Sequence, residues 1–369
     1  MNKLRFTTSV VVTVLTALLA GCATSPAPEH KDVHLVWPAP PETTRIRFVR
    51  SITSDEDLGR DTTFSQKLMN FLAGERPPAN HIGQPLGIAV SDDGNRLYVS
   101  DFLQRSVFIF DFQKKSFAKI SGLAVPAGIA LDAEENVYVV ETAKKTVSVF
   151  DHEQKRTKAI TDPSVVRPIG IAIDRARGRI YLVDTGDKRT EQSVIHIFDL
   201  QGKYLGRIGH GRGPKNDQFI NPTYATVDAH GNLYVSDTLN SRVQMFGPDG
   251  RYLKTFGGLG DAWGYFDKPK GVAVDSFGNL YVADSGWSNI QIFNPKAQVL
   301  LFFGGRGAIP GMMQNPTAIA IDKHNRIYVA DYLNHRVGVY QLINTTAADS
   351  FLVPPTPNPG AEKTPTAGR

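Results

Sequence analysis

One phrase recurs six times along this chain, and no other feature constrains its fold as strongly. Each copy has a proline, a short apolar stretch, a polar turn and a second apolar stretch that ends in an acid. The prolines are spaced 41, 42, 54, 47 and 47 residues apart, at Pro85, Pro126, Pro168, Pro222, Pro269 and Pro316. A period of about 40–50 residues with several short strands per unit is typical of β-propellers and solenoids.

The fifth copy shows how one unit divides into four strands. Its residues 271–275 (GVAVD) predict an innermost strand, and Gly278 suits the turn that follows because it tolerates a positive φ angle. Residues 280–283 (LYVA) predict a second strand without polar alternation, so both of its faces are expected to be buried between neighbouring sheets. Residues 290–293 (IQIF) and 299–303 (VLLFF) complete the unit as its third and fourth strands.

The number of strands tests whether the units close into a ring. Fourth strands are expected near Phe117, Lys158, Tyr204, Tyr252 and Leu300, but the last copy ends after its third strand. The missing strand is supplied if residues 45–52 (RIRFVRSI) pair with that third strand, at 337–342. We therefore expect an all-β, six-bladed propeller over residues 45–343, closed by pairing of an N-terminal strand with the C-terminal blade.

The repeats also resemble a known family. The phrases DSFGNLYVADSGWSNIQIF and DAHGNLYVSDTLNSRVQMFGPDGRYLKTFGG are similar to NHL repeats, and the similarity extends over roughly residues 80–342. The segment WPAPPETTRIRFVRSI, which precedes them, resembles the start of NHL-type six-bladed propeller lipoproteins of bacteria. The resemblance implies the propeller fold but no single activity, because propellers host many unrelated functions.

The N-terminus has the order of a lipoprotein signal. Lys3 and Arg5 precede an apolar segment at 10–20, which is shorter than the about 20 residues needed to span a bilayer. Residues 19–22, LAGC, resemble a bacterial lipobox that ends at Cys22. This resemblance implies removal of residues 1–21 and acylation of Cys22, with chains such as palmitate that anchor the protein to a membrane. The alternative is an ordinary secreted protein whose cysteine lies near the cleavage site by chance.

The single cysteine and the charge balance exclude several classes of protein. Cys22 is the only cysteine, so a disulfide scaffold, a cysteine-ligated zinc site and a CxxC redox pair are excluded. Lys plus Arg number 41 and Asp plus Glu number 36, and this mild net charge of +5 gives no support to a nucleic-acid binder. Ala23 follows the cysteine where an aspartate would signal inner-membrane retention, so the resemblance implies an outer-membrane protein facing the periplasm.

Two flanking segments and one insertion lie outside the repeats. The proline-rich residues 22–44 predict a semi-extended tether, and residues 344–369 predict a disordered tail. Residues 63–74 (TFSQKLMNFLAG) carry one apolar stripe at helical spacing, which predicts a short helix. That helix would serve either as a lid or docking element near the channel mouth or as a cover over exposed blade ends.

Six acids are the first candidates for chemistry, because each ends the second strand of a unit and all should ring one face. They are Asp101, Glu141, Asp184, Asp237, Asp284 and Asp331. Six carboxylates around a channel suit a cation, but a residue that recurs in every unit is better interpreted as an acceptor for backbone N–H groups in its own loop. Residues 91–95 and 248–250 resemble parts of calcium loops yet lack the remaining oxygen ligands, so they predict hairpin turns.

Catalytic motifs are scarce in this sequence. The nine histidines form no blade-to-blade set that would hold a metal, and the chain has no GxSxG, P-loop or dinucleotide motif. We therefore expect no metal site and no cofactor, and binding rather than catalysis. A metal-dependent lyase or hydrolase with its site at the channel mouth stays the alternative.

Departures from the repeat point to binding. Tyr224 stands where the other five units have a small residue, and there it would narrow the channel or fill a void. Loops on the face of the acids carry candidate partner-binding residues: Phe102, Trp263, Tyr265, Trp287, Tyr332 and His335. Aromatic side chains at a rim suit protein or sugar binding, or they pack loop on loop. The sequence favours a lipid-anchored envelope scaffold with a protein or glycan partner.

Overall fold

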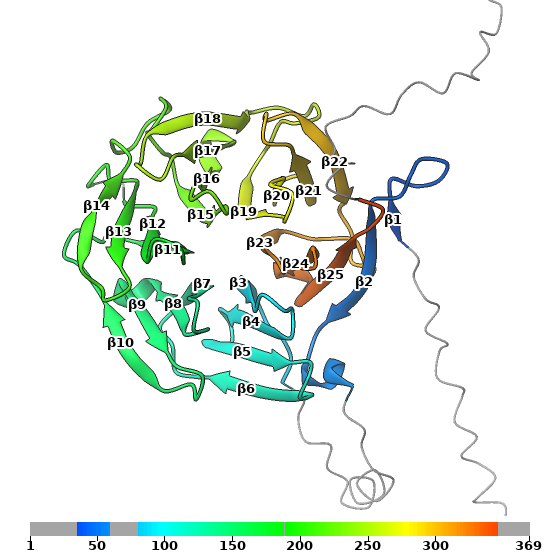
Figure 1. The fold of residues 1–369 in the computed structure, drawn as a ribbon, viewed down its shortest axis with the longest axis horizontal. Coiled ribbons are helices and arrows are strands. Elements are labelled where there is room, and N and C mark those ends of the chain that lie inside the picture. Colours follow the sequence, from blue (N-terminus) through cyan, green and yellow to red (C-terminus); the bar gives the residue numbers. More distant parts are fainter. Residues whose placement is uncertain (1–34, 60–79, 188, 346–369) are drawn as a thin grey trace, which may run out of the picture. The chain divides into compact units, whose positions relative to one another are not determined.

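The computed structural model describes residues 35–59, 80–187 and 189–345. In these ranges six antiparallel sheets surround a central axis (Figure 1). Five sheets have four strands and the sixth has five, so the all-β, six-bladed propeller predicted from the repeats is confirmed. The blades are numbered one to six in the order of their innermost strands.

Each blade runs from an innermost strand at the axis to an outer strand at the rim (Figure 1). The innermost strands are β3 (Pro85–Val90), β7 (Pro126–Leu131), β11 (Pro168–Asp174), β15 (Pro222–Val227), β19 (Pro269–Val274) and β23 (Pro316–Ile321). The second strands are β4 (Arg96–Asp101), β8 (Val137–Glu141), β12 (Arg179–Asp184), β16 (Leu233–Asp237), β20 (Leu280–Asp284) and β24 (Arg326–Asp331).

The two outer positions of each blade follow in chain order. The third strands are β5 (Ser106–Asp111), β9 (Thr146–Phe150), β13 (Val194–Asp199), β17 (Arg242–Phe246), β21 (Asn289–Phe293) and β25 (Arg336–Leu342). The fourth strands are β6 (Ser116–Ile120), β10 (Arg156–Ile160), β14 (Tyr204–Ile208), β18 (Tyr252–Gly257), β22 (Val299–Gly304) and, in blade six, β2 (Ile46–Ile52). The helices of the described ranges are short 3-10 turns at η1 (Asp55–Leu58), η2 (Thr142–Lys144), η3 (Thr238–Asn240) and η4 (Tyr332–Asn334).

The second strands are buried on both faces, as their unbroken apolar sequences predict. All five residues of β20 are buried, and so are all five of β16. The core lies between neighbouring blades, where a face of one sheet packs on a face of the next. For example, Tyr138 and Val140 of blade two pack with Ile171 and Ile180 of blade three. Burial of both faces explains why these strands lack polar alternation.

Blade six takes its fourth strand from the N-terminal side of the chain. β2 pairs antiparallel with β25, from Ile46 opposite Leu342 to Ile52 opposite Val337. This is the pairing expected for residues 45–52, and it joins the two ends of the ring by backbone hydrogen bonds.

A fifth strand, β1 (Val36–Trp37), pairs with the outer edge of β2. The Trp37 ring packs on Phe303 and Tyr340, with ring centroids 5.8 and 6.0 Å apart. The sequence placed residues 36–37 in the semi-extended tether, and their pairing with β2 corrects that part of the prediction. The contact with two buried aromatic rings is the physical reason that this short segment lies on blade six.

Small residues beside the axis are required by close packing of the innermost strands. A Cβ atom on Gly170 would lie 2.2 Å from the carbonyl oxygen of Thr223, and one on Gly87 would lie 2.3 Å from that of Ala127. Neither distance is compatible with a side chain, and both contacts are to backbone atoms that have little room to move. Crowding of the backbone near the axis therefore explains the small residues at this position of the repeat.

Several predictions concern residues outside the described ranges. These are the signal segment at 1–21, the acylated Cys22, the helix at 63–74 and all but the first two residues of the tail at 344–369. None of the helices in the described ranges has the length and apolar character needed to cross a bilayer.

Candidate functional site

The propeller has two faces with different loops. We call the face at which the second strands end the acid face, because it carries the six acids. The opposite face carries the hairpin turns between the first and second strands, and we call it the turn face.

The six acids are buried and support loops of the acid face. Each is at most 1% exposed. Asp101 accepts the backbone N–H of Gly83 at 2.5 Å, and Asp237 accepts that of Ile220 at 2.6 Å. In each blade the carboxylate fixes the loop that leads into the innermost strand. The interpretation of these acids as backbone acceptors is confirmed, and no three His, Cys, Asp or Glu side chains of the described residues converge as metal ligands.

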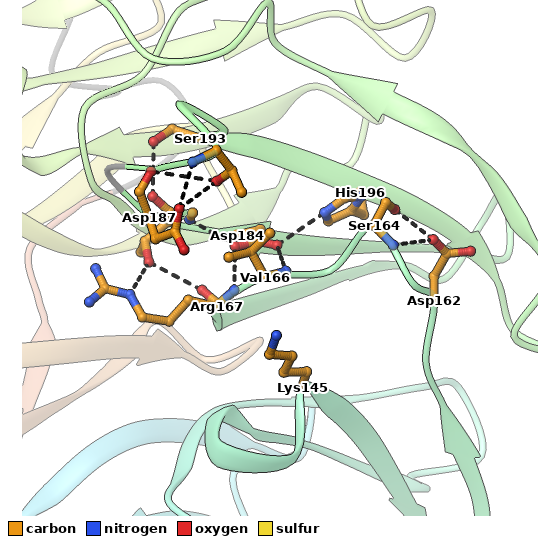
Figure 2. A network of polar contacts seen from close by, with 12 residues as sticks. Lys145, Asp162, Ser164, Val166, Arg167, Asp184, Asp187, Ser193 and His196 are labelled. Carbon is orange, nitrogen blue, oxygen red and sulfur yellow. Dashed lines mark hydrogen bonds and ion pairs between the residues drawn. The ribbon is translucent and has the colours of Figure 1, made fainter.

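Blade three shows how such an acid is held (Figure 2). Asp184 accepts the backbone N–H of Val166 on Oδ2 at 2.6 Å and that of Arg167 on Oδ1 at 2.8 Å. His196 Nε2 lies 3.2 Å from Oδ2. Burial alone would raise the pKa of the Asp184 carboxyl, but these hydrogen bonds and one from Gly186 outweigh it, so the pKa lies below its ordinary value. Asp184 is therefore a charged structural acceptor.

Four of the predicted partner-binding residues are exposed on the acid face. The exposed fractions are 40% for Phe102, 73% for Trp263, 46% for Tyr265 and 45% for Trp287. Trp263 also meets Phe302 of the outer strand of blade five edge to face, with ring centroids 5.2 Å apart. Its indole thus combines packing with an exposed surface.

The other two predicted residues lie differently. Tyr332 is half-buried, and its hydroxyl donates to Gln84 Oε1 at 2.9 Å. His335 is exposed, but its Nδ1 contacts the carbonyl oxygen of Gly83. Both contacts join blade six to the loop that leads into blade one. Tyr332 and His335 therefore connect two loops of the acid face.

Sequence reasoning missed a set of exposed aliphatic residues on the same face. They are Leu103, Leu239, Leu259, Ile309 and Leu333. A signal for three of them was present, because Leu103, Leu239 and Leu333 each stand two residues after the acid that ends a second strand. We define the apolar sector as the exposed residues Phe102, Leu103, Leu239, Leu259, Trp263, Tyr265, Trp287, Ile309 and Leu333.

The apolar sector covers only part of the acid face. Its residues come from blades four, five, six and one and from the loops that join them. Blades two and three have charged residues at this face instead, including Lys144, Lys145 and Arg189. Lys144 pairs with Glu141 at 2.9 Å while about half of its side chain stays exposed. The acid face is therefore divided into an apolar sector and a charged sector.

Tyr224 narrows the central channel near the acid face. Its hydroxyl donates to the carbonyl oxygen of Leu86 at 2.5 Å, so the side chain runs from blade four to blade one, on the far side of the axis. It packs against the core between blades four and five and also against the core between blades six and one. Of the two roles considered for Tyr224, the structure supports narrowing of the channel.

A cavity of about 610 Å³ occupies the channel below Tyr224. Its walls are the innermost strands of all six blades, and it continues to the turn face at Asp92, Arg175 and Asp228. The channel mouth thus lies on the turn face, opposite the apolar sector.

The hairpin turns of the turn face are built by local hydrogen bonds. Asp93 accepts from Ser91 Oγ at 2.6 Å and from the backbone N–H of Asn95 at 2.9 Å, and Gly94 has a φ of 71°. In residues 248–250, the other segment that resembles part of a calcium loop, the N–H of Gly250 donates to the carbonyl of Gly247 at 2.8 Å. Both segments are hairpin turns, as predicted.

Comparison with known proteins agrees with this geometry. Residues 55–172 match the SMP-30/Gluconolactonase/LRE-like region, and residues 266–293 and 313–340 match the NHL repeat. A stretch of 166 residues is 24% identical to Protein brain tumor of Drosophila melanogaster, over 42% of this chain and 15% of that protein. The match thus spans a small part of that relative.

Solved structures share the fold at low sequence identity. A protein of unknown function from Bacteroides thetaiotaomicron has a TM-score of 0.57 and 17% identity, over 71% of this chain and 70% of that chain. Virginiamycin B lyase from Staphylococcus aureus has a TM-score of 0.52 and 15% identity, over 71% of this chain and 96% of that chain. At such identities the likeness concerns the fold alone. The repeats, the blades and the family matches together identify the chain as a six-bladed β-propeller that contains NHL repeats.

Proposed function

We propose that this propeller is a binding scaffold whose apolar sector docks a protein partner. The observation that carries the proposal is the gathering of nine exposed large apolar side chains on one part of one face. The remaining exposed large apolar residues of the described ranges, Val49, Leu205, Leu253 and Phe302, are spread over outer strands. Contiguous apolar surface with aromatic residues is typical of protein interfaces.

The chemistry of the sector favours a protein over a glycan. Five of its nine residues are aliphatic, and aliphatic side chains offer sugars neither stacking planes nor hydrogen bonds. The six carboxylates that would suit sugar hydroxyls are buried and hold backbone N–H groups. A sugar site needs several polar groups at the surface, whereas an apolar anchor surrounded by charge suits a protein.

The alternative is a lyase or hydrolase with a metal at the channel mouth. Its support is the shared fold with virginiamycin B lyase, and a shared fold does not determine an activity. It would need ligands from several blades, and the described residues bring no such group together. The binding function is the better supported of the two.

The proposal includes attachment to a membrane through Cys22. It is supported by the LAGC motif after a short apolar segment, and by the proline-rich residues that separate it from the blades. Several acyl chains on that cysteine would hold the propeller at an envelope membrane, with an outer-membrane, periplasm-facing position as the expectation. A membrane-bound scaffold would concentrate its partner at that surface.

The docking function is tested by comparing two double variants. Leu103→Ser with Leu333→Ser alters the apolar sector, and Leu205→Ser with Leu253→Ser alters outer strands at similar exposed fractions. Membranes of the producing cells are cross-linked, and proteins bound to each variant are quantified by mass spectrometry. We expect one protein to be recovered with the wild type and the outer-strand variant, and at least about tenfold less with the sector variant. Equal recovery with both variants, or recovery of glycan alone, would overturn the proposal.

A further inference from the structure

Among the residues that the structure describes, the lining of the central cavity extends from Tyr224 to the turn face, away from the apolar sector. Tyr224 crosses the axis at the acid face, while the lining residues continue down to the turns of the opposite face. A volume of about 610 Å³ lies in the range of small-molecule sites. A molecule in this cavity would enter from the turn face, and its binding would not depend on the proposed docking of a protein.

The cavity wall is rich in backbone hydrogen-bonding groups. Each innermost strand ends the strand order of its sheet, so one edge pairs with the second strand and the other edge faces the axis (Figure 1). Edge strands leave N–H and C=O groups unpaired, and such groups bind water or a ligand with complementary groups. Between them lie aliphatic side chains such as Ile88, Ile129 and Ile319. The wall suits a molecule that carries amide or hydroxyl groups.

One cation stands at the mouth of this cavity. Among the lining residues Arg175 is the only one with a positive charge. From its turn in blade three it donates Nε–H to the carbonyl oxygen of Leu131 in blade two at 3.0 Å. Its Nη1 reaches Asp92 Oδ1 in blade one at 2.6 Å, so the side chain extends beside three blades. The guanidinium group is therefore held at the rim of the cavity.

Asp92 differs from the other acids of the mouth. Asp174 accepts the backbone N–H of Arg177 at 3.0 Å, and Asp228 accepts that of Asn232 at 2.9 Å, so both hold their own turns. The hydrogen bond to the Asp92 carboxylate comes from Arg175, and the Asp92 side chain is 71% exposed. The Asp92 carboxylate therefore binds Arg175, and it does not hold the hairpin turn to which Asp92 belongs.

The turn position that holds Asp92 and Arg175 also varies from blade to blade. The first turn residue of each blade is, in order, Asp92, Ala133, Arg175, Ala229, Ser276 and Lys323. Structural residues recur from blade to blade, as the six buried acids do. Asp92 and Arg175 are 83 residues apart in sequence and belong to blades that are not neighbours, yet their side chains meet at the cavity mouth. This pair is therefore not part of the repeat.

We propose that the central cavity binds a small carboxylic acid that bears amide or hydroxyl groups, with Arg175 as the ligand of its carboxylate. In the structure the Asp92 carboxylate takes the position on Arg175 that the carboxylate of this ligand would occupy. A guanidinium group suits a planar carboxylate, because parallel N–H groups donate to both of its oxygens. The proposal goes beyond the docking function and does not rest on it.

The test uses two probes that differ only in charge. N-acetylglycylglycine has a carboxylate and two amide groups, and its C-terminal amide is the neutral counterpart. Calorimetric titration of the full chain should give binding of the acid at least about tenfold tighter than that of the amide, because charge-assisted hydrogen bonds are the stronger ones. Hexanoate, a carboxylate without amide groups, should also bind at least about tenfold more weakly than the acid.

Two variants assign the site. Arg175→Gln should weaken binding of N-acetylglycylglycine at least about tenfold. Asp92→Asn should tighten binding of the probe up to about fivefold, because the Asp92 carboxylate no longer competes for Arg175. This factor corresponds to the strength of an exposed ion pair. The docking variant with serine at positions 103 and 333 should bind the probe like the wild type, so failure of one proposal is distinguishable from failure of the other. Unfolding curves verify that each variant is folded.

Four results would overturn this proposal. The first is equal affinity for the acid and its amide, and the second is binding that Arg175→Gln leaves unchanged. The third is weaker binding after Asp92→Asn, which would make Asp92 part of the site instead of a competitor. Absence of any binding of the acid at millimolar concentration would also contradict it.

Discussion

The hydroxyl oxygen of Tyr224 lies 2.5 Å from the carbonyl oxygen of Leu86, on the opposite side of the propeller axis. One side chain thus joins blade four to blade one and separates the central cavity from the acid face. Burial raises the pKa of the Tyr224 phenol well above its ordinary value, so the hydroxyl remains a hydrogen-bond donor at physiological pH. Tyr224 therefore lies between the central cavity and the acid face, so the two proposed ligands would bind at separate places.

Two substitutions at Tyr224 separate its hydrogen bond from its volume. Tyr224→Phe should lower the free energy of unfolding by about 1 kcal/mol, because it leaves the Leu86 carbonyl without this donor. Tyr224→Ala should lower it by about 3 kcal/mol and open the channel from face to face. Urea unfolding measures both effects. Equal values for the two variants would contradict the closing role of the ring.

The pairing of β2 with β25 can be tested within a single strand. Ile52 is completely buried, whereas Val49 on the same strand is 44% exposed. Ile52→Ala should lower the free energy of unfolding by about 2–4 kcal/mol, and Val49→Ala should change it by less than about 0.5 kcal/mol. Urea unfolding of both variants measures this difference. Similar small effects would mean that β2 does not hold the ring closed.

The pH dependence of stability tests the Asp184 network. Its pKa is lower in the folded state than in the unfolded chain, so ionised Asp184 stabilises the fold above about pH 4, and this contribution is lost as the pH falls through the folded-state pKa. Asp184→Asn should therefore cost about 2 kcal/mol at pH 7 and progressively less below about pH 4. Unfolding is measured at several pH values, with Asp261→Asn, an exposed change, as the control. A cost that does not change with pH would contradict the assignment.

The lipid anchor predicted at Cys22 has a direct chemical test. Cells that make the full chain are grown with labelled palmitate. The label should enter the wild type and be absent from Cys22→Ala, because the sequence has no second cysteine to accept it. Label in both proteins, or in neither, would contradict acylation at this residue.

The fold was predictable because its signals are local and repeated. Doubly buried strands such as Leu280–Asp284 differ from half-exposed strands in their lack of alternation, and the recurring proline sets the period. Counting strands was enough to assign Ile46–Ile52 to blade six. By contrast, β1 was not predicted, because the prolines that follow Trp37 indicated a tether. Its position depends on the Trp37 contacts with Phe303 and Tyr340, which lie far away in sequence.

The site was less predictable because its residues meet through the curvature of the ring. The sequence offered two roles for Tyr224, and only the ring geometry places its hydroxyl at Leu86. The Arg175–Asp92 pair joins turns of blades that are not neighbours, so no local sequence pattern predicts it. Exposed leucines such as Leu239 were missed because a single apolar residue in a loop has the same appearance in sequence as a core residue.

The most direct measurement of the docking function is site-specific photo-crosslinking in cells. p-Benzoylphenylalanine is introduced either at Leu239, in the apolar sector, or at Leu253, on an outer strand; the two residues are 56% and 48% exposed. After irradiation, adducts of the propeller are resolved by mass and identified. We predict one protein adduct from position 239 that is absent from position 253, and its loss when Leu103 and Leu333 are both changed to serine. The same adducts from both positions, or none from position 239, would contradict the proposal that the apolar sector docks a protein.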